Sequence, residues 1–448
     1  MKKTAAFLSL GCKVNSYETE AMRSLFEKAG YTIVDFKDTA DVYVVNTCTV
    51  TNIADRKSRQ MLHQARKRNE KAVIAAVGCY VQAAEEELLR DSSVDLVVGN
   101  NIKSAIVEMV EHFKEDDRKP EAVTDASTQK DYEEMDVSSG MEKTRAFIKI
   151  QDGCNRFCSY CIIPYVRGRV RSRKEQDILS EIEKLADKGY KEFVLTGIHI
   201  SSYGTDRSVA GINDGGQEEK MPLAGLIRKI GAIPGIERIR VGSLEPRIIT
   251  EEFAKEIAMV QQFCPHYHLS LQSGSDTVLA RMNRKYTSEE FYEKILLLRK
   301  YFDHPAFTTD IIVGFPGETE EEFKETYEFV KKIGFSHIHV FKYSKRAGTK
   351  AAEMPAQIAE DVKHARSCQL IAGAEEMSKE YKALFVGRIE KILVEEELVL
   401  GGRTYQTGHN ERYLKLAIES HEDLTNRIIS AKVTGCLTED ILLSEITH

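Results

Sequence analysis

Short apolar runs alternate with longer amphipathic segments along the first hundred residues. The runs are rich in β-branched residues and carry few charges, as strands do when a parallel sheet is covered on both faces. This alternation predicts βαβ units and a doubly wound α/β domain over residues 1–112. The expected strands are residues 4–10, 42–46, 72–77 and 94–98.

The amphipathic segments between these strands predict helices with recognisable ends. Asn15 and Glu18 form a candidate capping pair before the segment TEAMRSLFEKAG, and Gly30 is expected to stop that helix. A second helix, over residues 52–69, is amphipathic and basic.

A second alternation begins at residue 145. Residues 113–143 before it are polar and contain Pro and Ser, so they are expected to form a linker or a surface excursion. Six further apolar runs alternate with helical segments, one of which has a candidate capping box at Thr319 and Glu322. The pattern predicts a full or incomplete β/α barrel over residues 144–375, with its chemistry at the carboxyl ends of the strands. Strands are expected at residues 146–150, 193–197, 238–242, 267–271, 307–313 and 337–342.

The last segment, residues 380–448, has a different pattern. Strand-like stretches at residues 384–397, 412–420 and 427–446 are separated by Gly401-Gly402 and by TGHNE. Together they predict a small antiparallel β-barrel.

Composition narrows the class of protein. The 448 residues are 42% hydrophobic and 30% charged, which is typical of a soluble globular chain. No apolar run approaches the roughly 18 residues of a membrane-spanning helix, so neither membrane insertion nor export is expected. The net charge of −7 means that a nucleic-acid partner would have to be held by local basic patches. Nine cysteines without an export signal indicate thiols or metal ligands in the reducing cytoplasm.

Three cysteines take the same position relative to three expected strands. Cys12, Cys48 and Cys79 each follow the carboxyl end of a strand, at the edge where open α/β sheets bind ligands. One such cysteine would be a packing residue, whereas three predict a shared thiolate site. Three thiolates with one open iron fit a 4Fe–4S cluster. A structural zinc site, which normally needs a fourth ligand, and three buried or separately reactive thiols are the alternatives.

Cys154, Cys158 and Cys161 form a C-x3-C-x2-C loop directly after the first expected barrel strand. Such a loop lets three thiolates bind one face of a 4Fe–4S cube and leaves the fourth iron without a protein ligand. A ferredoxin loop carries a further cysteine, so this loop indicates chelation of a substrate and not simple electron relay. Tyr160 within the loop either stacks on a nucleoside or packs in the core.

These motifs carry a family resemblance. A three-cysteine loop after the first strand of a β/α barrel is similar to the radical S-adenosylmethionine (SAM) superfamily. GCKVN, NTC and GCY around the other three cysteines, with IIPYVRGRVRSR, LTGIHIS, LQSGSD and DIIVGFPGET, resemble the methylthiotransferases over nearly the whole chain. Within that family, LGCKVNSYETE and CIIPYVRGRVRSR are most similar to the members that modify N6-threonylcarbamoyladenosine (t6A) in tRNA. Isopentenyladenosine relatives typically have GCQMN and ribosomal-protein relatives GCPKN. The segment from about residue 380 resembles the TRAM domain of the family.

The resemblance implies a reaction and its cofactors. Cys154, Cys158 and Cys161 would hold one 4Fe–4S cluster, whose open iron would bind SAM. Reductive cleavage of SAM would release a 5′-deoxyadenosyl radical that removes hydrogen from C2 of t6A at tRNA position 37, next to the anticodon. Cys12, Cys48 and Cys79 would hold a second 4Fe–4S cluster that delivers sulfur, and a second SAM would supply the methyl group. The implied partners are the tRNA anticodon loop and an electron donor such as flavodoxin or ferredoxin.

Residues at the ends of the expected barrel strands are weaker candidates for binding SAM, because each alone is more often structural. A glycine among them would allow close backbone approach. They are Thr196, Gly197, Ser270, Gln272, Asp310 and Gly314, together with Tyr160.

Binding of tRNA requires cations. Arg167, Arg169, Arg171 and Arg173 alternate along a stretch after the cysteine loop and are expected to line one face. The basic helix adds further cations. From Tyr381 onwards the chain has eight Lys and Arg against eleven Asp and Glu, so the small barrel would have to bind RNA through one face. Expected contacts there are Arg403, Tyr405 and Arg412, with Tyr413 and Lys415.

Several alternatives remain open. Methylthiolation of isopentenyladenosine or of a ribosomal-protein side chain keeps the chemistry and changes the substrate. A non-enzymatic iron–sulfur protein that binds RNA or senses redox state belongs to another class, and so does a zinc-stabilised α/β protein. Cys264, Cys368 and Cys436 have no partner at ligand spacing and are interpreted as packing residues.

Overall fold

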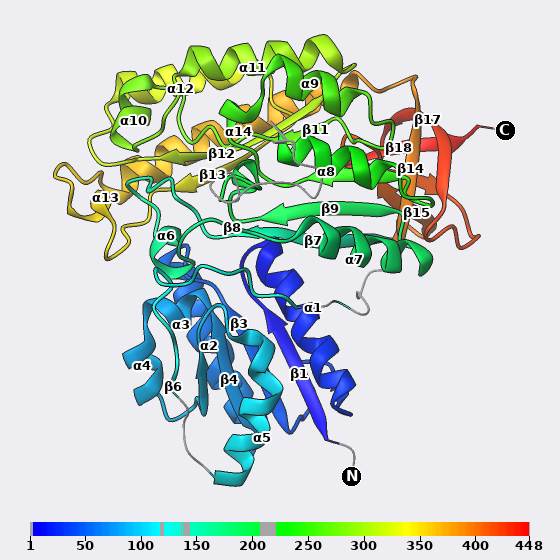
Figure 1. The fold of residues 1–448 in the computed structure, drawn as a ribbon. Helices are drawn as coiled ribbons and strands as arrows, with labels where there is room; N and C mark the ends of the chain where they lie inside the picture. The colour runs from blue at the N-terminus through cyan, green and yellow to red at the C-terminus, as the bar shows by residue number, and fades with distance from the viewer. Residues whose placement is uncertain (1–2, 117–120, 136, 138–143, 207–220, 448) are drawn as a thin grey trace, which may run out of the picture.

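The computed structural model describes residues 3–116, 121–135, 137, 144–206 and 221–447. Three units follow one another along the chain (Figure 1): a parallel sheet flanked by helices, a curved β/α unit and a small β-barrel. Within these ranges, no helix combines the length and the apolar character needed to cross a membrane.

The N-terminal sheet has six parallel strands in the order β2-β1-β3-β4-β5-β6. Successive residues of a strand point to opposite faces. Val42 and Val44 therefore pack with α1 and α5, while Tyr43 and Val45 pack with α2. Helices on both faces confirm the doubly wound fold. The elements are β1 (Thr4–Ser9), α1 (Lys13–Lys28), β2 (Thr32–Val34), β3 (Val42–Thr47), α2 (Asn52–Arg68), β4 (Val73–Gly78), α3 (Cys79–Ala83), α4 (Glu85–Arg90), β5 (Leu96–Val98), η1 (Lys103–Ala105), α5 (Ile106–Asp116) and β6 (Glu121–Ala122).

The predicted capping pair of the first helix is wrong. Helix α1 begins at Lys13, so Asn15 and Glu18 lie inside it and both are buried. The Asn15 amide donates to the carbonyls of Leu10 at 2.7 Å and Thr47 at 2.9 Å, across the edge of the sheet. These buried hydrogen bonds place the two side chains in the interior, where an unpaired polar group would be costly.

The segment predicted to be a linker is packed in its described part. Strand β6 extends the first sheet beyond the expected boundary at residue 112. Ala126 and Met135 are buried, and the Tyr132 hydroxyl donates to the Lys149 carbonyl at 3.0 Å. Residues 117–120, 136 and 138–143 of this prediction lie outside the described residues.

The central unit is an incomplete barrel, one of the two forms predicted. Six parallel strands curve in the order β7-β9-β10-β11-β12-β13, with β8 antiparallel beside β7. Isolated bridges from Ile239 to Phe263 and from Leu244 to Leu269 join its two sheets. The largest hydrophobic core lies between these strands and the surrounding helices. The strands are β7 (Arg145–Asp152), β8 (Arg171–Ser172), β9 (Glu192–Gly197), β10 (Arg238–Val241), β11 (His266–His268), β12 (Ala306–Val313) and β13 (His337–Lys342).

The helices of this unit follow the predicted alternation. Thr319 and Glu322 form the expected capping box, with both reciprocal hydrogen bonds, at the start of α12. The helices are α6 (Ile163–Val166), α7 (Glu175–Asp187), η2 (Ile200–Ser202), α8 (Pro222–Gly231), η3 (Pro246–Ile248), α9 (Glu251–Ala258), α10 (Asp276–Arg281), α11 (Ser288–Tyr301), α12 (Glu320–Ile333), α13 (Lys350–Glu353) and α14 (Glu360–Ala383).

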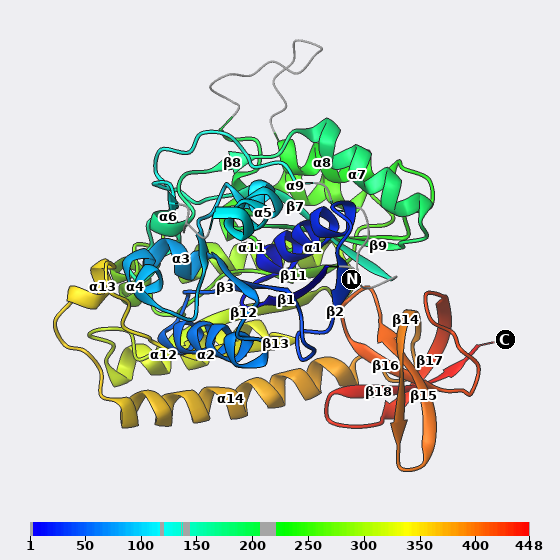
Figure 2. The same ribbon diagram turned by 90° about the horizontal axis from the view of Figure 1, so that it is seen from below.

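The long helix α14 leads into a closed five-stranded barrel (Figure 2). All neighbouring strands are antiparallel except β16 and β18. The prediction missed β15, because its TGH was interpreted as a break. Gly408 is required there, since an added Cβ would lie 1.9 Å from the Leu393 carbonyl oxygen. The strands are β14 (Ile389–Leu400), β15 (Arg403–His409), β16 (Lys415–Glu419), β17 (Ile428–Cys436) and β18 (Ile441–Ile446).

A buried carboxylate, Glu192 on β9, anchors the small barrel to the central unit. Glu192 accepts from Arg145 at 2.5 Å and from Arg240 at 3.1 Å. Arg145 also donates to Glu395 of the small barrel at 2.7 Å. Arg238 donates to the carbonyls of His409 and Lys391 at 2.8 and 2.7 Å. One acidic side chain therefore organises the arginines that hold two units together.

Removing this carboxylate should loosen the small barrel. Glu192→Ala leaves buried arginines uncompensated, so we expect a loss of about 3–5 kcal/mol in the free energy of unfolding. Urea unfolding measures the loss, and limited proteolysis between α14 and β14 reports undocking. Glu419→Ala removes an exposed ion pair with Arg403 and should cost less than about 1 kcal/mol. Equal losses in the two variants would contradict the anchoring role.

Candidate active site

The first cysteine triad lies at the carboxyl edge of the N-terminal sheet. Cys12 is the N-cap of α1 after β1, Cys48 follows β3, and Cys79 begins α3 after β4. These three strands are adjacent, and the structure brings the thiols close enough to influence one another electrostatically. Gly11 has a φ of +101°, and a Cβ added there would lie 2.7 Å from the Cys48 sulfur. Only glycine leaves room for this approach.

The surroundings of two thiols of this triad, Cys12 and Cys48, raise their pKa. Cys12 is open to solvent from one side, yet desolvation by the protein around it raises its pKa, as does the neighbouring Cys79. Burial raises the pKa of Cys48 to about 11. Arg167 lowers the pKa of both thiols, and its Nε donates to the Cys79 sulfur at 3.1 Å. On binding a metal, the thiols of the triad would release their protons, as expected of metal ligands.

The second triad follows β7, the first strand of the central unit. Gly153 begins the loop with a φ of +72°, and a Cβ there would lie 1.8 Å from the Arg169 carbonyl oxygen. The Arg156 backbone N–H donates to the Cys154 sulfur at 3.4 Å, and Arg284 donates to the Cys158 sulfur at 3.3 Å. Burial raises the pKa of Cys154 to about 11.

Cys161 completes this triad. Burial raises its pKa to about 12, with a further contribution from Cys158. Its backbone N–H donates to the Cys158 carbonyl at 3.0 Å, which closes the loop into a tight turn. Backbone and guanidinium N–H groups aimed at sulfur are suited to thiolates that carry a metal cluster, where hydrogen bonds to sulfur tune the cluster.

Arg284, in the segment before α11, was missed by the sequence analysis. It donates to the Ser270 carbonyl at 2.9 Å, and the Tyr286 hydroxyl donates to the same carbonyl. Its sequence surroundings, NRKYTS, contain no cysteine and gave no signal. The carbonyl of Ser270, one of the SAM candidates, therefore positions the cation that contacts Cys158.

A cavity of about 750 Å³ lies where the three units meet. Cys12 and Lys13 line it from the N-terminal unit, and Tyr413 lines it from the small barrel. Of the SAM candidates, Thr196, Gly197 and Asp310 line this cavity. Strand β9, which ends at Thr196 and Gly197, is the neighbour of β7, which carries the second triad. Cys12 of the first triad therefore lies on the cavity wall, whereas the second triad follows the neighbouring strand and none of its cysteines is a lining residue.

The other SAM candidates are placed differently. Tyr160 packs against an apolar cluster that includes Phe315 and Tyr343, as a core residue does. Gln272 has a left-handed φ of +72° and its backbone N–H donates to the Asp310 carbonyl. A Cβ on Gly314 would lie 2.3 Å from the Lys363 side chain, so this glycine accommodates α14. The proposed contacts of these residues with SAM remain predictions.

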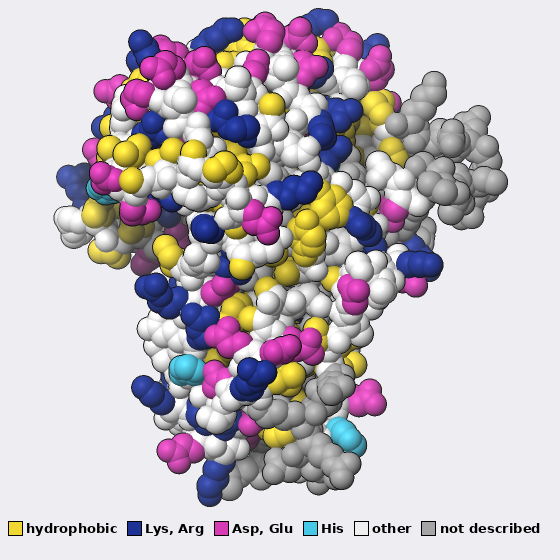
Figure 3. Space-filling model, turned by 90° about the vertical axis from the view of Figure 1, so that its left-hand side faces the viewer, with side chains coloured by type: hydrophobic (Ala, Val, Ile, Leu, Met, Phe, Trp, Pro, Cys, Tyr) yellow, Lys and Arg dark blue, Asp and Glu magenta, His cyan; other side chains and the backbone are white. Residues whose placement is uncertain are grey.

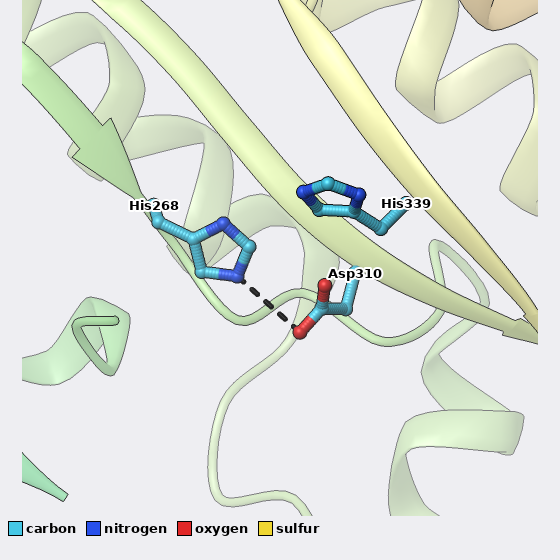
Figure 4. Close-up of side chains that lie close together, drawn as sticks. All are labelled: His268, Asp310 and His339. Atoms are coloured by element: carbon cyan, nitrogen blue, oxygen red, sulfur yellow. Dashed lines mark hydrogen bonds and ion pairs between the residues drawn. The ribbon is translucent and has the colours of Figure 1, made fainter. Parts of the chain in front are cut away.

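His268, Asp310 and His339 meet on the wall of the cavity (Figure 4). Their potential ligand atoms lie within 4.8 Å of one another. His268 uses both ring nitrogens, Nε2 with Asp310 at 3.3 Å and Nδ1 with the Thr308 hydroxyl at 3.0 Å. Desolvation lowers the pKa of His339, so its ring is neutral at pH 7. The group offers polar atoms to a ligand in the cavity.

Arg167 is not on the surface, which corrects its prediction as an RNA contact. It is fully buried and donates to Glu18 at 2.6 Å, to Asn15 at 2.6 Å and to Asp152 at 3.2 Å. Lys149 donates to the same Glu18 at 2.7 Å. Burial alone would raise the pKa of Glu18, yet Arg167, Lys103 and Lys149 hold it well below its usual range. This cluster joins α1 to the central unit.

The four alternating arginines do not share one face. Arg171 and Arg173 are also buried, and Arg173 pairs with Glu181. Only Arg169 of the four is exposed, with its guanidinium 4.6 Å from the ring centre of Phe157. The alternation predicted a single face because it assumed an extended strand, whereas β8 is only two residues long and Gly168 turns the chain with a φ of +72°.

The expected RNA contacts of the small barrel also include both buried and exposed residues. Tyr405 is buried, which contradicts its predicted role. Arg412 donates to the carbonyls of His304 and Asp303 at 3.0 and 2.7 Å, so it serves the interface with the central unit. Arg403 remains exposed. Figure 3 shows the opposite side of the molecule, at the left in Figure 1. There, basic and acidic side chains are interspersed and do not gather by sign.

Comparisons with known proteins match two parts of the chain to family models and most of its length to curated relatives. The radical SAM superfamily matches residues 148–330, and the uncharacterized protein family UPF0004 matches residues 4–99. The chain is 42% identical to threonylcarbamoyladenosine tRNA methylthiotransferase MtaB of Bacillus subtilis, over 96% of this chain and 93% of the relative. It is 36% identical to tRNA-2-methylthio-N(6)-dimethylallyladenosine synthase of Clostridium novyi, over 88% of this chain and 87% of the relative.

A solved structure with the same fold is the radical S-adenosylmethionine methyltransferase TsrM from Kitasatospora setae. Its TM-score is 0.55 at 14% identity, over 76% of this chain and 73% of that chain. At this identity the likeness concerns the fold alone.

Two arginine variants distinguish a structural role from RNA contact. Arg167→Leu leaves Glu18 and Asp152 buried with fewer partners, so we expect a loss of about 3–5 kcal/mol in the free energy of unfolding. Arg169→Leu removes an exposed cation and should change stability by less than about 0.5 kcal/mol. Denaturant unfolding measures both. If both variants kept full stability and lost RNA affinity equally, the assignment of Arg167 to the interior would be refuted.

Proposed function

Because the chain belongs to the tRNA methylthiotransferases of the radical SAM superfamily, we propose that it converts t6A at tRNA position 37 to 2-methylthio-t6A. The observation that carries this proposal is the presence of two cysteine triads, one of which contributes Cys12 to the wall of the central cavity. Identity of 42% to a threonylcarbamoyladenosine tRNA methylthiotransferase over nearly the full length supports the substrate.

The two triads are suited to two 4Fe–4S clusters. Cys154, Cys158 and Cys161 would hold the cluster that binds SAM, and Cys12, Cys48 and Cys79 the auxiliary cluster. When bound, the clusters and SAM supply the radical that takes hydrogen from adenosine C2, the inserted sulfur and the methyl group. In each triad an arginine, Arg284 or Arg167, donates to a cysteine sulfur. These donors stabilise thiolate charge and orient the ligand.

The cavity residues bind and orient the nucleoside. Thr196 and Gly197 end the strand beside the SAM-binding triad, and Cys12 brings the auxiliary triad to the same space. Neutral His339 and the paired His268 and Asp310 offer hydrogen bonds to polar atoms of the substrate. Sequential hydrogen removal and sulfur insertion would require the bound substrate to bring its C2 to both clusters.

The tRNA backbone would contact cations that remain exposed. Arg169 lies next to the SAM-binding loop, and Arg403 is exposed on the small barrel. Arg56 and Lys57 are exposed near the start of α2, not far along the chain from Cys48. Local patches of this kind suit a chain with an overall charge of −7. An electron donor such as flavodoxin or ferredoxin in the cytoplasm would supply the reducing electron.

The second candidate is methylthiolation of isopentenyladenosine in tRNA. It rests on 36% identity to a relative that acts as a tRNA-2-methylthio-N(6)-dimethylallyladenosine synthase. The same triads and the same chemistry would serve it, so only the cavity wall distinguishes the two substrates.

Separate replacement of the two triads tests the proposed division of work. Changing Cys154, Cys158 and Cys161 to Ala should abolish cleavage of SAM to 5′-deoxyadenosine. Changing Cys12, Cys48 and Cys79 to Ala should leave that cleavage but stop formation of the methylthio product. Chromatography of the SAM products measures the first effect, and mass spectrometry of tRNA nucleosides measures the second.

The control changes Cys368 and Cys436 to Ala and should retain both activities. These two cysteines are exposed, so their interpretation as packing residues is wrong, whereas Cys264 is buried as expected. If cells lacking the gene lose 2-methylthio-t6A and accumulate t6A, the substrate is as proposed. Loss of the isopentenyl counterpart would favour the second candidate. Product formation by the variant without Cys12, Cys48 and Cys79 would refute the sulfur-donor assignment.

A further inference from the structure

Lys13 is an unpaired cation in the wall of the central cavity. It directly follows Cys12, lines the cavity and is exposed to it. Among the described residues, its ammonium group has no hydrogen-bond or ion-pair partner. The ring centre of Phe147 lies 6.0 Å from its Nζ. A buried or cavity-facing cation normally has a counter-ion, so the missing partner points to an anionic ligand.

The other lysines and arginines of this cavity wall are already paired. Lys415 forms an ion pair with Glu396 at 2.7 Å. Lys382 donates to the Glu439 carbonyl at 2.7 Å and lies 3.6 Å from Asp440. Arg412 donates to two backbone carbonyls. Of the basic lining residues that the structure describes, Lys13 is thus the one that is available to an anion.

Acidic groups on the wall do not compete for Lys13. Asp310 is paired with His268, and Asp440 lies beside Lys382. Behind Lys13, the three arginines Arg145, Arg238 and Arg240 are grouped around Glu192, and the only further carboxylate among their described ion-pair partners is Glu395. The neighbourhood of Lys13 therefore keeps a positive potential, which favours one carboxylate or phosphate-like group at this end of the cavity.

The proposed substrate carries such a group. The threonylcarbamoyl substituent on N6 ends in a free carboxylate, whereas an isopentenyl substituent is a neutral hydrocarbon. On the adenine ring, C2 and the carbon that bears N6 flank the same nitrogen, N1. A side chain next to Cys12, whose triad is proposed to act at C2, can therefore reach the N6 substituent when the N1 edge of the ring faces it.

We propose that Lys13 binds the carboxylate of the threonylcarbamoyl group and so selects t6A over adenosines with neutral N6 substituents. This inference rests on the proposed function. An ammonium–carboxylate pair in a partly desolvated cavity is a charge-assisted hydrogen bond, which is stronger than a neutral one. Lys13 thereby acts as a specificity residue, while the hydrogen removal and sulfur insertion depend on the cysteine triads.

The test compares two RNA substrates with the reconstituted holoenzyme. One is an anticodon stem-loop that carries t6A, and the other carries the methyl ester of t6A, in which the charge is removed. With wild-type protein, kcat/KM should be about 10- to 100-fold higher for the acid than for the ester. In Lys13→Gln, kcat/KM should fall for the acid and stay unchanged for the ester, so that most of the preference is lost. Lys13→Arg should keep the preference.

Two controls separate recognition from damage. Lys415→Gln removes a cation of the same wall that is already paired, and it should leave the acid-to-ester ratio within about 2-fold of wild type. Iron content and SAM cleavage in the absence of RNA report the state of both clusters in Lys13→Gln and should match wild type. A structural defect would lower activity on both RNAs, and it would not change their ratio.

The outcomes of this experiment are distinct. If kcat/KM of Lys13→Gln falls equally for the acid and the ester, or for neither, the inference is overturned while the proposed function stands. If the wild-type holoenzyme modifies an isopentenyladenosine stem-loop and leaves t6A untouched, the proposed function fails and the inference fails with it. Loss of the acid preference in Lys13→Gln, with retention in Lys13→Arg, supports both.

Discussion

The architecture depends on the buried ion pair between Glu18 and Arg167. Arg167 follows the loop of Cys154, Cys158 and Cys161, while Glu18 lies on the helix that starts after Cys12. The same guanidinium contacts Asp152 of β7 and the sulfur of Cys79. Buried charges are costly unless every partner is in place, so the two units have one favourable arrangement. That arrangement fixes the position of one cysteine triad relative to the other, which a reaction using both requires.

The junction with the small barrel repeats this construction. Glu192 collects Arg145, Arg238 and Arg240, and these arginines reach the carboxylate and carbonyls of the small barrel. In both junctions, charged residues that the sequence pattern assigned to a nucleic-acid surface have a structural role. Lys13 lies near the second junction and, within the part of the chain that the structure describes, has no hydrogen-bond or ion-pair partner. The arginines of both junctions are paired, whereas Lys13 is available to the ligand proposed above.

Local patterns predicted the elements well where the relevant interactions are local. The capping box of Thr319 and Glu322 forms because both residues lie within one helical turn. The buried strands of the first sheet match because apolar β-branched runs need only a covered sheet. Asn15 and Glu18 have similar capping chemistry, yet they serve contacts with Thr47 and Arg167, which are distant in the chain. No window of sequence contains those partners, so the prediction of a cap failed.

Cysteine spacing and strand ends were enough to indicate two thiol triads, because ligand chemistry and the common edge of parallel strands are properties of short motifs. The burial of Arg167 and Tyr405, the contact of Arg284 with Cys158 and the exposure of Lys13 to the cavity were not accessible in this way. Whether a cation faces solvent, a sulfur or a carboxylate depends on which distant segments pack against it. Only folding brings those segments together, and the resulting desolvation then decides whether a charge is structural or available to a ligand.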